Sequence, residues 1–146
     1  MGYATNGLSF RTLRQANLKR LPQFKSSTGL PAHTEADGSD WSLADWLQAT
    51  VGELGELANL LKKVRRGDIT MAEAMPEVRR EFADVVTYLD IFAMRAGVDL
   101  GEATIAKFNE VSRRVGAHVF IGYDDDWHMF DPDDAKPAIL RGTEEA

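Results

Sequence analysis

Two pairs of acidic residues stand three positions apart in neighbouring segments: Glu53 with Glu56, and Glu81 with Asp84. On an α-helix, residues three apart share a face with Cβ atoms about 5 to 6 Å apart, so each pair can bind one ligand. Four carboxylates offer hard oxygen donors, which suit two Mg²⁺ or Mn²⁺ ions that keep some waters for phosphate oxygens. If the two helices pack antiparallel, the pairs face each other. We therefore interpret these four residues as candidate metal ligands for chemistry on a phosphate group.

Each pair alone is weak as a signal, because such spacing arises by chance on many solvated helix faces. Their occurrence on consecutive segments, both beside apolar neighbours, is what favours a metal site. A helical oligomerisation or regulatory module whose acids only form salt bridges remains the non-enzyme alternative. A di-iron carboxylate bundle is a further alternative, but it expects a Glu three residues before a His, and the sequence contains no such pair.

Lys63 follows Glu56 by seven residues, about 20° away around the same helix, so it is placed to meet a phosphate held by the metals. The three histidines, His33, His118 and His128, fall in predicted loops without helical spacing to the acids, and we expect no metal or catalytic role for them. Trp46 has the spacing of a core residue. Trp41 and Trp127 fit either of two roles, packing in the core or stacking on a nucleobase.

The elements that must position these residues are helices. Residues 9–20 have apolar spacing typical of a short helix, with Ser9 as a cap and Pro22 after its end. The segment 22–40 is rich in Ser, Thr, Gly and Pro and is predicted to be a long loop.

Three longer helices follow. One begins after a cap at Asp40 or Ser42 and ends at Gly67. The next has Pro76 in its first turn and ends near Gly97, and the last runs from about 100 to 115 before Gly116. Residues 118–123 are predicted to form a brief extended piece.

The predicted fold is therefore all-α: one domain over 1–146, built as an antiparallel bundle of about four to five helices. Its helical core spans about 41–116, and 122–146 is an irregular acidic tail. The second and third helices carry more apolar surface than one thin bundle covers, so we expect a dimer, completed as a dimer of dimers.

Composition narrows the classes of protein. The hydrophobic fraction of 44% and charged fraction of 27% are typical of a globular chain, and no apolar run is long enough to span a membrane. The absence of cysteine fits a reducing, cytoplasmic location. The net charge of −6 comes from the tail after Gly122, whereas the first 34 residues hold five bases and no acid. This distribution gives no broad nucleic-acid-binding face, and neither nucleic acid nor a membrane is an expected partner.

Three blocks of sequence, at 52–68, 81–100 and 107–116, resemble the MazG-like nucleoside triphosphate pyrophosphohydrolases, especially their single-domain phage and bacterial members. The blocks read GELGELANLLKKVRRGD, EFADVVTYLDIFAMRAGVDL and KFNEVSRRVG. The resemblance implies an all-α dimer or tetramer, two or three Mg²⁺ ions replaceable by Mn²⁺, and hydrolysis of a (deoxy)nucleoside triphosphate to the monophosphate and pyrophosphate.

The resemblance also implies roles for individual residues. Glu53, Glu56, Glu81 and Asp84 match the metal ligands, and the positions matching substrate contacts are Asn59, Lys63, Lys107 and Arg114. Many members have two adjacent acids at the start of the first motif, but here Gly52 replaces the earlier one. Glu53 is therefore the expected residue to orient the attacking water. We expect the substrate to be a purine triphosphate such as dGTP or GTP and the biological role to be control of the nucleotide pool. The alternative is a pyrophosphatase of the same superfamily that acts on dUTP or dCTP.

Overall fold

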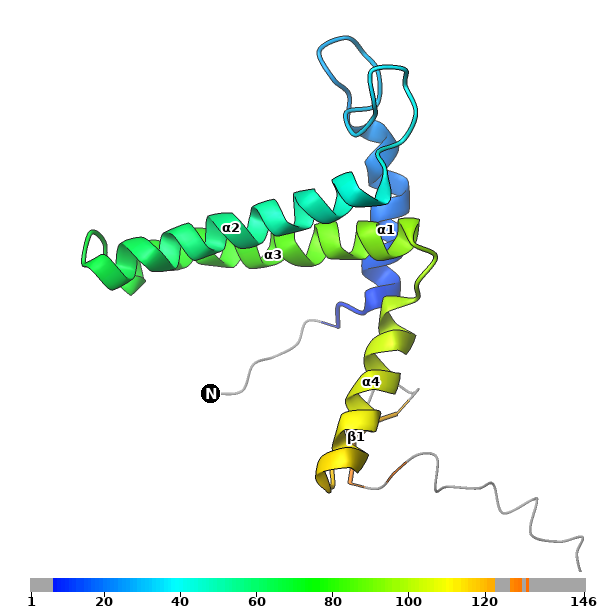
Figure 1. Cartoon of the computed structure of the whole chain (residues 1–146), viewed down its shortest axis with the longest axis vertical. Coiled ribbons are helices and arrows are strands. Elements are labelled where there is room, and N and C mark those ends of the chain that lie inside the picture. The colour runs from blue at the N-terminus through cyan, green and yellow to red at the C-terminus, as the bar shows by residue number, and fades with distance from the viewer. Residues whose placement is uncertain (1–6, 123–126, 130, 132–146) are drawn as a thin grey trace, which may run out of the picture. The chain divides into compact units, whose positions relative to one another are not determined.

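The computed structural model describes residues 7–122, 127–129 and 131, and this part of the chain is helical, as the sequence predicts (Figure 1). Its residues fall into two compact units, Met1–Val98 and Asp99–Ala146. The first unit contains α1 (Phe10–Arg20), a 3₁₀ turn (Leu21–Gln23), α2 (Leu43–Arg66) and α3 (Met71–Arg95). The second contains α4 (Leu100–Val115), β1 (Phe120–Ile121) and β2 (Trp127–His128).

Helix α1 begins and ends where the sequence predicts. The Ser9 side chain accepts a hydrogen bond from the Thr12 amide at 3.1 Å, which satisfies one donor of the first turn. Pro22 lies in the 3₁₀ turn directly after the helix. The following segment forms the predicted loop, with isolated bridges pairing Lys25 with Pro31 and Thr34 with Asp40.

Helices α2 and α3 form an antiparallel hairpin joined by a short turn (Figure 1). Ser42 and Asp45 form a reciprocal capping box at the start of α2, so Ser42 is the cap among the two candidates. Gly67 ends α2 at φ 78°, a left-handed conformation that suits a residue without a Cβ atom. Thr70 and Glu73 form the same reciprocal cap on α3.

The predicted start of the third helix is wrong. Pro76 does not lie in the first turn, because α3 already begins at Met71 and Pro76 stands inside it. The capping box of Thr70 and Glu73 satisfies backbone amides at the start of the helix. The helix therefore begins five residues before the position that the apolar pattern indicated. A proline at this position only removes one early helical hydrogen bond, and the helix continues through it.

The hairpin packs through a small core near its turn. Leu57 of α2 and Ala74 and Val78 of α3 are buried against one another. Partly buried apolar side chains surround them: Leu60, Val64, Ile69 and Met75. This packing sets the register in which the two helices face each other.

Trp46 lies at the other end of the hairpin and is fully buried, which confirms its prediction as a core residue. The ring of His33 stacks on Trp46 at a centroid distance of 5.3 Å, and Trp41 and Tyr88 contact the same ring pair. The loop after α1 is thereby attached to α2 and α3 through aromatic contacts.

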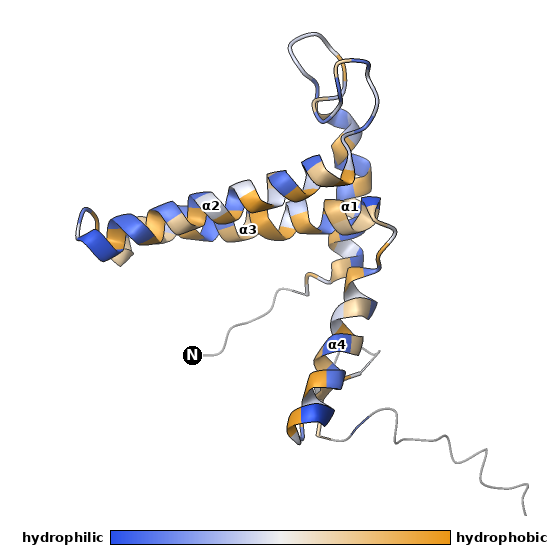
Figure 2. Cartoon of the chain, viewed as in Figure 1, coloured by the Kyte–Doolittle hydropathy of each residue, from blue (hydrophilic) through white to orange (hydrophobic). Residues whose placement is uncertain are grey.

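Hydrophobic residues occur along both helices of the hairpin (Figure 2), and many of their side chains remain exposed. Large apolar side chains that are more than a third exposed on its two helices are Leu43, Leu47, Val51, Leu54, Leu61, Met71, Phe82, Val86 and Leu89. Only part of the apolar pattern in the sequence is therefore used for packing within the hairpin. Even so, no helix among the described residues combines the length and apolar character needed to cross a membrane.

The second unit is built on α4. Asp99 caps its start, and Gly116 ends it at φ 69°. The side chain of Asn109 is buried and exchanges two hydrogen bonds of 2.9 Å with the backbone of Ile121. The predicted extended piece is confirmed as β1, which pairs antiparallel with β2. Strand β2 lies in the segment predicted to be irregular, and most of the acidic tail falls outside the described residues.

Helix α1 is attached to α3 by a buried polar cluster that the sequence did not predict. Asp90 is fully buried, and its two carboxylate oxygens accept hydrogen bonds of 2.9 Å from Arg14 Nε and Asn17 Nδ2. Arg14 also donates to the Val98 carbonyl at 3.2 Å. Such a buried carboxylate is tolerated because both of its oxygens have donors.

We predict that Asp90→Ala lowers the free energy of unfolding by about 2 to 3 kcal/mol, because it leaves the donors of Arg14 and Asn17 without their acceptor. Urea unfolding at a fixed chain concentration measures the change. Arg80→Ala, which removes an exposed i,i+3 pair with Glu77 at 2.8 Å, is the control, with an expected change below about 0.5 kcal/mol. Equal effects of the two substitutions would show that the buried cluster does not hold α1.

Candidate functional site

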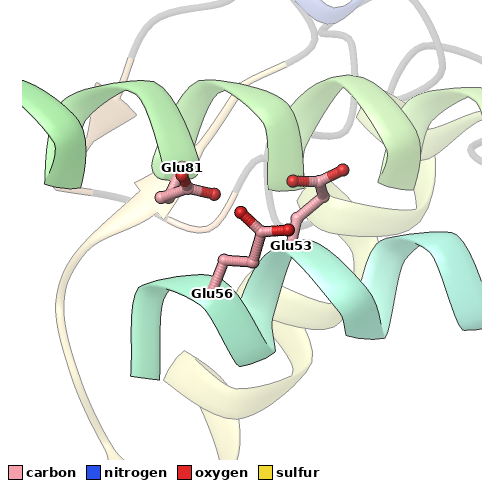
Figure 3. Close-up of side chains that lie close together, drawn as sticks. All are labelled: Glu53, Glu56 and Glu81. Atoms are coloured by element: carbon pink, nitrogen blue, oxygen red, sulfur yellow. The ribbon is translucent and has the colours of Figure 1, made fainter. Parts of the chain in front are cut away.

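Three of the four predicted metal ligands converge on one point of the hairpin. Glu53 and Glu56 project from α2 towards Glu81 of α3 (Figure 3). Each offers a carboxylate oxygen, and these oxygens lie within 4.8 Å of one another. That spacing allows one cation to contact oxygens from both helices. The cluster has two causes. Glu53 and Glu56 share a face of α2 because they are three residues apart, and α3 packs antiparallel to α2 so that Glu81 meets that face.

Glu81 is the most buried member of this trio, with 6% of its surface exposed. Among the described residues its buried oxygen Oε2 has no hydrogen-bond partner. A buried carboxylate oxygen without a donor is unfavourable, and such groups are rare in native proteins unless an ion or water satisfies them. The residues present therefore fit a divalent cation, because no ion pair among the described residues brings a positive charge to these three acids.

Burial and mutual repulsion both raise pKa values in the trio. The pKa of Glu53 is raised first by burial and then by the charges of Asp84, Glu56 and Glu81. The pKa of Glu81 is raised first by burial and then by Glu56, Glu77 and Asp84. Charged carboxylates at these positions thus destabilise the metal-free fold.

Asp84, the fourth predicted ligand, lies three residues after Glu81 on α3 and is exposed. It is not part of the close trio, but its charge is the second largest cause of the raised pKa of Glu53. The charge of Asp84 therefore influences Glu53, but Asp84 is not among the residues whose carboxylate oxygens lie within 4.8 Å of one another. Its role as a ligand stays a prediction.

The two predicted substrate contacts on α2 are both exposed and lie beyond Glu56 along the helix. Asn59 accepts a hydrogen bond of 2.8 Å from Lys62, and Lys63 is exposed in the last turn of α2. Both occupy the same hairpin as the trio.

Lys107 and Arg114 belong to the second unit, where both are exposed on α4. Lys107 donates to Glu110 at 2.6 Å, which together with the charge of Arg114 lowers the pKa of Glu110. Their predicted contacts with a triphosphate stay predictions.

Gly52, which stands where the expected family pattern would have an acid, is exposed on α2. A Cβ atom built at Gly52 would meet no heavy atom within 4 Å. No steric reason in the described chain therefore explains the glycine.

Tyr88 of α3 is a further ionisable group that the charges of the site influence. It follows Asp84 by one helical turn, and its pKa is raised first by burial and then by the charges of Glu53 and Asp84. Its spacing of four residues from Asp84 was visible in the sequence, but the approach of Glu53 depends on the hairpin register. Tyr88 thus joins the aromatic cluster around Trp46 to the carboxylates.

Comparison of the chain with known protein families, with curated proteins and with solved structures finds no match. The reading of the site therefore rests on its own residues and geometry.

We predict that Glu81→Gln raises the melting temperature of the metal-free protein at pH 7 by a few degrees. A raised pKa means that the folded chain holds the proton more tightly than the unfolded chain, so stability falls as pH rises above the ordinary value of 4.5. A neutral amide of similar shape avoids this loss. The gain should disappear near pH 4, where Glu81 itself is protonated.

The same thermal melts with Mn²⁺ provide the second half of the test. Mn²⁺ should raise the melting temperature of the unsubstituted protein at pH 7 but not that of Glu81→Gln, because the amide cannot replace the carboxylate charge. Glu102→Gln, an exposed acid on α4, is the control and should keep the full response to Mn²⁺. Destabilisation by Glu81→Gln together with an unchanged Mn²⁺ response would contradict a metal site here.

Proposed function

We propose that the chain is a magnesium-dependent nucleoside triphosphate pyrophosphohydrolase of the MazG-like kind. The observation that carries the proposal is the trio of Glu53, Glu56 and Glu81, with oxygens within 4.8 Å and a buried Glu81 oxygen that has no described partner. A salt-bridged structural module would place cations against these acids, yet no ion pair of the described residues involves any of the three. This favours the enzyme over the non-catalytic alternative.

Water would attack phosphorus at the α-phosphate, and the bond from that phosphorus to the bridging oxygen would break to release pyrophosphate. Mg²⁺ ions bound at the carboxylates would neutralise the triphosphate and lower the pKa of a bound water. Glu53, Glu56, Glu81 and Asp84 hold the ions in the proposal. Glu53 orients the water, because Gly52 leaves no neighbouring acid on α2 to do so.

Lys63 and Asn59 are proposed to contact the bound nucleotide from α2, and Lys107 and Arg114 from α4. The expected substrate is a purine triphosphate such as dGTP or GTP, with dUTP or dCTP as the alternative within the same superfamily. The biological role in this proposal is control of the nucleotide pool.

The exposed apolar side chains of the hairpin support a dimer as the working form. Leu47, Val51 and Leu54 repeat at three- and four-residue spacing along α2, and each is about half exposed. Phe82 on α3 is 57% exposed, directly beside Glu81. A second hairpin covering these residues would complete a four-helix bundle and exclude water from one side of the carboxylates.

We predict that Glu53→Gln lowers the rate of triphosphate hydrolysis by at least about 100-fold while far-ultraviolet circular dichroism stays unchanged. The amide keeps the size of the side chain but removes the negative charge, which holds a cation and makes the carboxylate a strong acceptor for the attacking water. Asp84→Asn should have a comparable effect, since its charge acts on the same site. A near-normal rate in either folded variant would end the assignment.

We also predict that the unsubstituted chain sediments as a dimer or tetramer and that Leu54→Glu with Phe82→Glu shifts it towards monomer. Charges at these positions would have to be buried in the interface, at a free-energy cost of several kcal/mol. Leu8→Glu is the control, because Leu8 is 69% exposed outside the hairpin. Analytical ultracentrifugation distinguishes the cases, and a concentration-independent monomer mass for the unsubstituted chain would refute the dimer.

A further inference from the structure

The loop between α1 and α2, residues 24–41, is hydrogen-bonded within itself. The Ala32 amide donates to the Phe24 carbonyl at 3.0 Å, and the Glu35 amide donates to the Ser39 carbonyl at 2.8 Å. Two isolated bridges join further residues of the same segment. Because these backbone bonds stay inside the loop, its attachment to α2 and α3 depends on side chains.

His33 is a loop residue whose ring contacts both helices of the hairpin. Its imidazole stacks on Trp46 of α2, with 5.3 Å between ring centroids and 27° between the ring planes. It also meets the ring of Tyr88 of α3 at 6.2 Å. Phe24 and Trp41, from the two ends of the loop, pack edge-on against the same imidazole at 5.6 and 4.9 Å. One imidazole thus connects the loop to α2 and α3.

Other contacts between the loop and α3 hold it less firmly. Asp40 pairs with Arg95 at 2.9 Å, but both side chains are partly exposed, and such ion pairs stabilise little. A cavity of about 370 Å³ lies beside this pair, lined by residues of α1, the loop and α3 that include Leu18, His33 and Met94. Side chains around an open space lack the contacts that close packing would give them. The attachment of the loop therefore relies on the ring contacts of His33.

The surroundings of His33 suit a neutral imidazole. A neutral ring has one donor and one acceptor nitrogen, whereas a protonated ring has two donors. The Nδ1 atom of His33 is buried and has no hydrogen-bond partner among the described residues. The buried Nε1 of Trp46 also lacks a described partner, and it can only donate. On the side of α1, Arg20 lies 5.6 Å from the Phe24 ring and adds a further positive charge near the cluster.

The nearest acid does not reverse this preference. Asp40 favours the protonated imidazole, but it is already paired with Arg95, whose Cζ atom lies 5.9 Å from the Trp46 ring centroid. Helix α2 packs the uncharged Trp46 against His33, and α3 packs Tyr88, whose raised pKa keeps its hydroxyl protonated. Burial outweighs the charge of Asp40, so the pKa of His33 is lowered from its ordinary value of 6.5.

We propose that His33 is a pH-sensitive latch: its neutral imidazole fastens the loop of residues 24–41 to α2 and α3, and its protonation releases the loop. In the released loop the ring meets water and titrates at its ordinary value of 6.5, so this state binds the proton more tightly than the attached one. Attachment is therefore complete above pH 6.5 and is lost as the pH falls below it. Release uncovers Trp46 and opens the cavity, and it requires no metal at the carboxylates.

Tryptophan exposure between about pH 7.5 and about pH 5 tests the latch in the full chain. Trp127→Phe is present throughout, so that the emission comes from Trp41 and Trp46. The acrylamide quenching constant should rise about 2-fold or more as the pH falls, because the released loop leaves Trp46 accessible. His33→Phe keeps a ring but cannot take up a proton, so its quenching should not change with pH. His118→Gln, at an exposed histidine of the second unit, is the matched control and should respond as the reference chain does.

Equal responses of His33→Phe and the reference chain would overturn the latch, and so would constant quenching of the reference chain over this pH range. A second measurement avoids any change in the packing of the cluster. Nuclear magnetic resonance follows the Cε1–H signal of His33 in the unsubstituted chain, assigned by its loss in His33→Phe. The signal should titrate below pH 6.5, and a midpoint at or above 6.5 would contradict the proposal.

Discussion

The packing of α2 against α3 through Leu57, Ala74 and Val78 sets the register on which every part of the candidate site depends. Reciprocal capping boxes start both helices, and Gly67 turns the chain between them, so the hairpin has little freedom to slide. In this register Glu81 faces Glu53 and Glu56. A shift of α3 by one residue would rotate Glu81 away by about 100° and disperse the trio.

The two buried carboxylates of α3, Asp90 and Glu81, differ in whether protein donors satisfy their oxygens. Asp90 has a hydrogen-bond donor for each oxygen and attaches α1 to the hairpin, so its burial serves the fold. Glu81 has an oxygen without a described partner and two further glutamates beside it, so its burial opposes the fold. Glu81 can offer this oxygen to a cation, whereas both oxygens of Asp90 already accept hydrogen bonds from protein donors. The hairpin therefore carries an electrostatic penalty that a bound ion would relieve.

Local signals in the sequence predict the helices, apart from the start of α3, and they predict the spacing of the acids within each helix. Ser9, Ser42, Gly67 and Gly116 mark helix ends by local hydrogen bonding and backbone conformation, which neighbouring residues determine. The apolar pattern does not indicate the start of α3, because the capping box at Thr70 begins the helix before the apolar residues that face α2. The role of Asp90 was not predictable, because it depends on where α1 packs, more than 70 residues away in the chain. Periodicity also could not tell which apolar residues pack inside the hairpin and which, like Phe82, stay exposed.

Product identification tests the central claim most directly. Purified protein would be incubated with Mg²⁺ and each of the eight common ribo- and deoxyribonucleoside triphosphates, and the nucleotides separated by liquid chromatography. The account predicts that at least one triphosphate is converted to its monophosphate with one equivalent of pyrophosphate, and that chelation of Mg²⁺ stops the reaction. Release of diphosphate and inorganic phosphate, or no turnover of any of the eight, would contradict it.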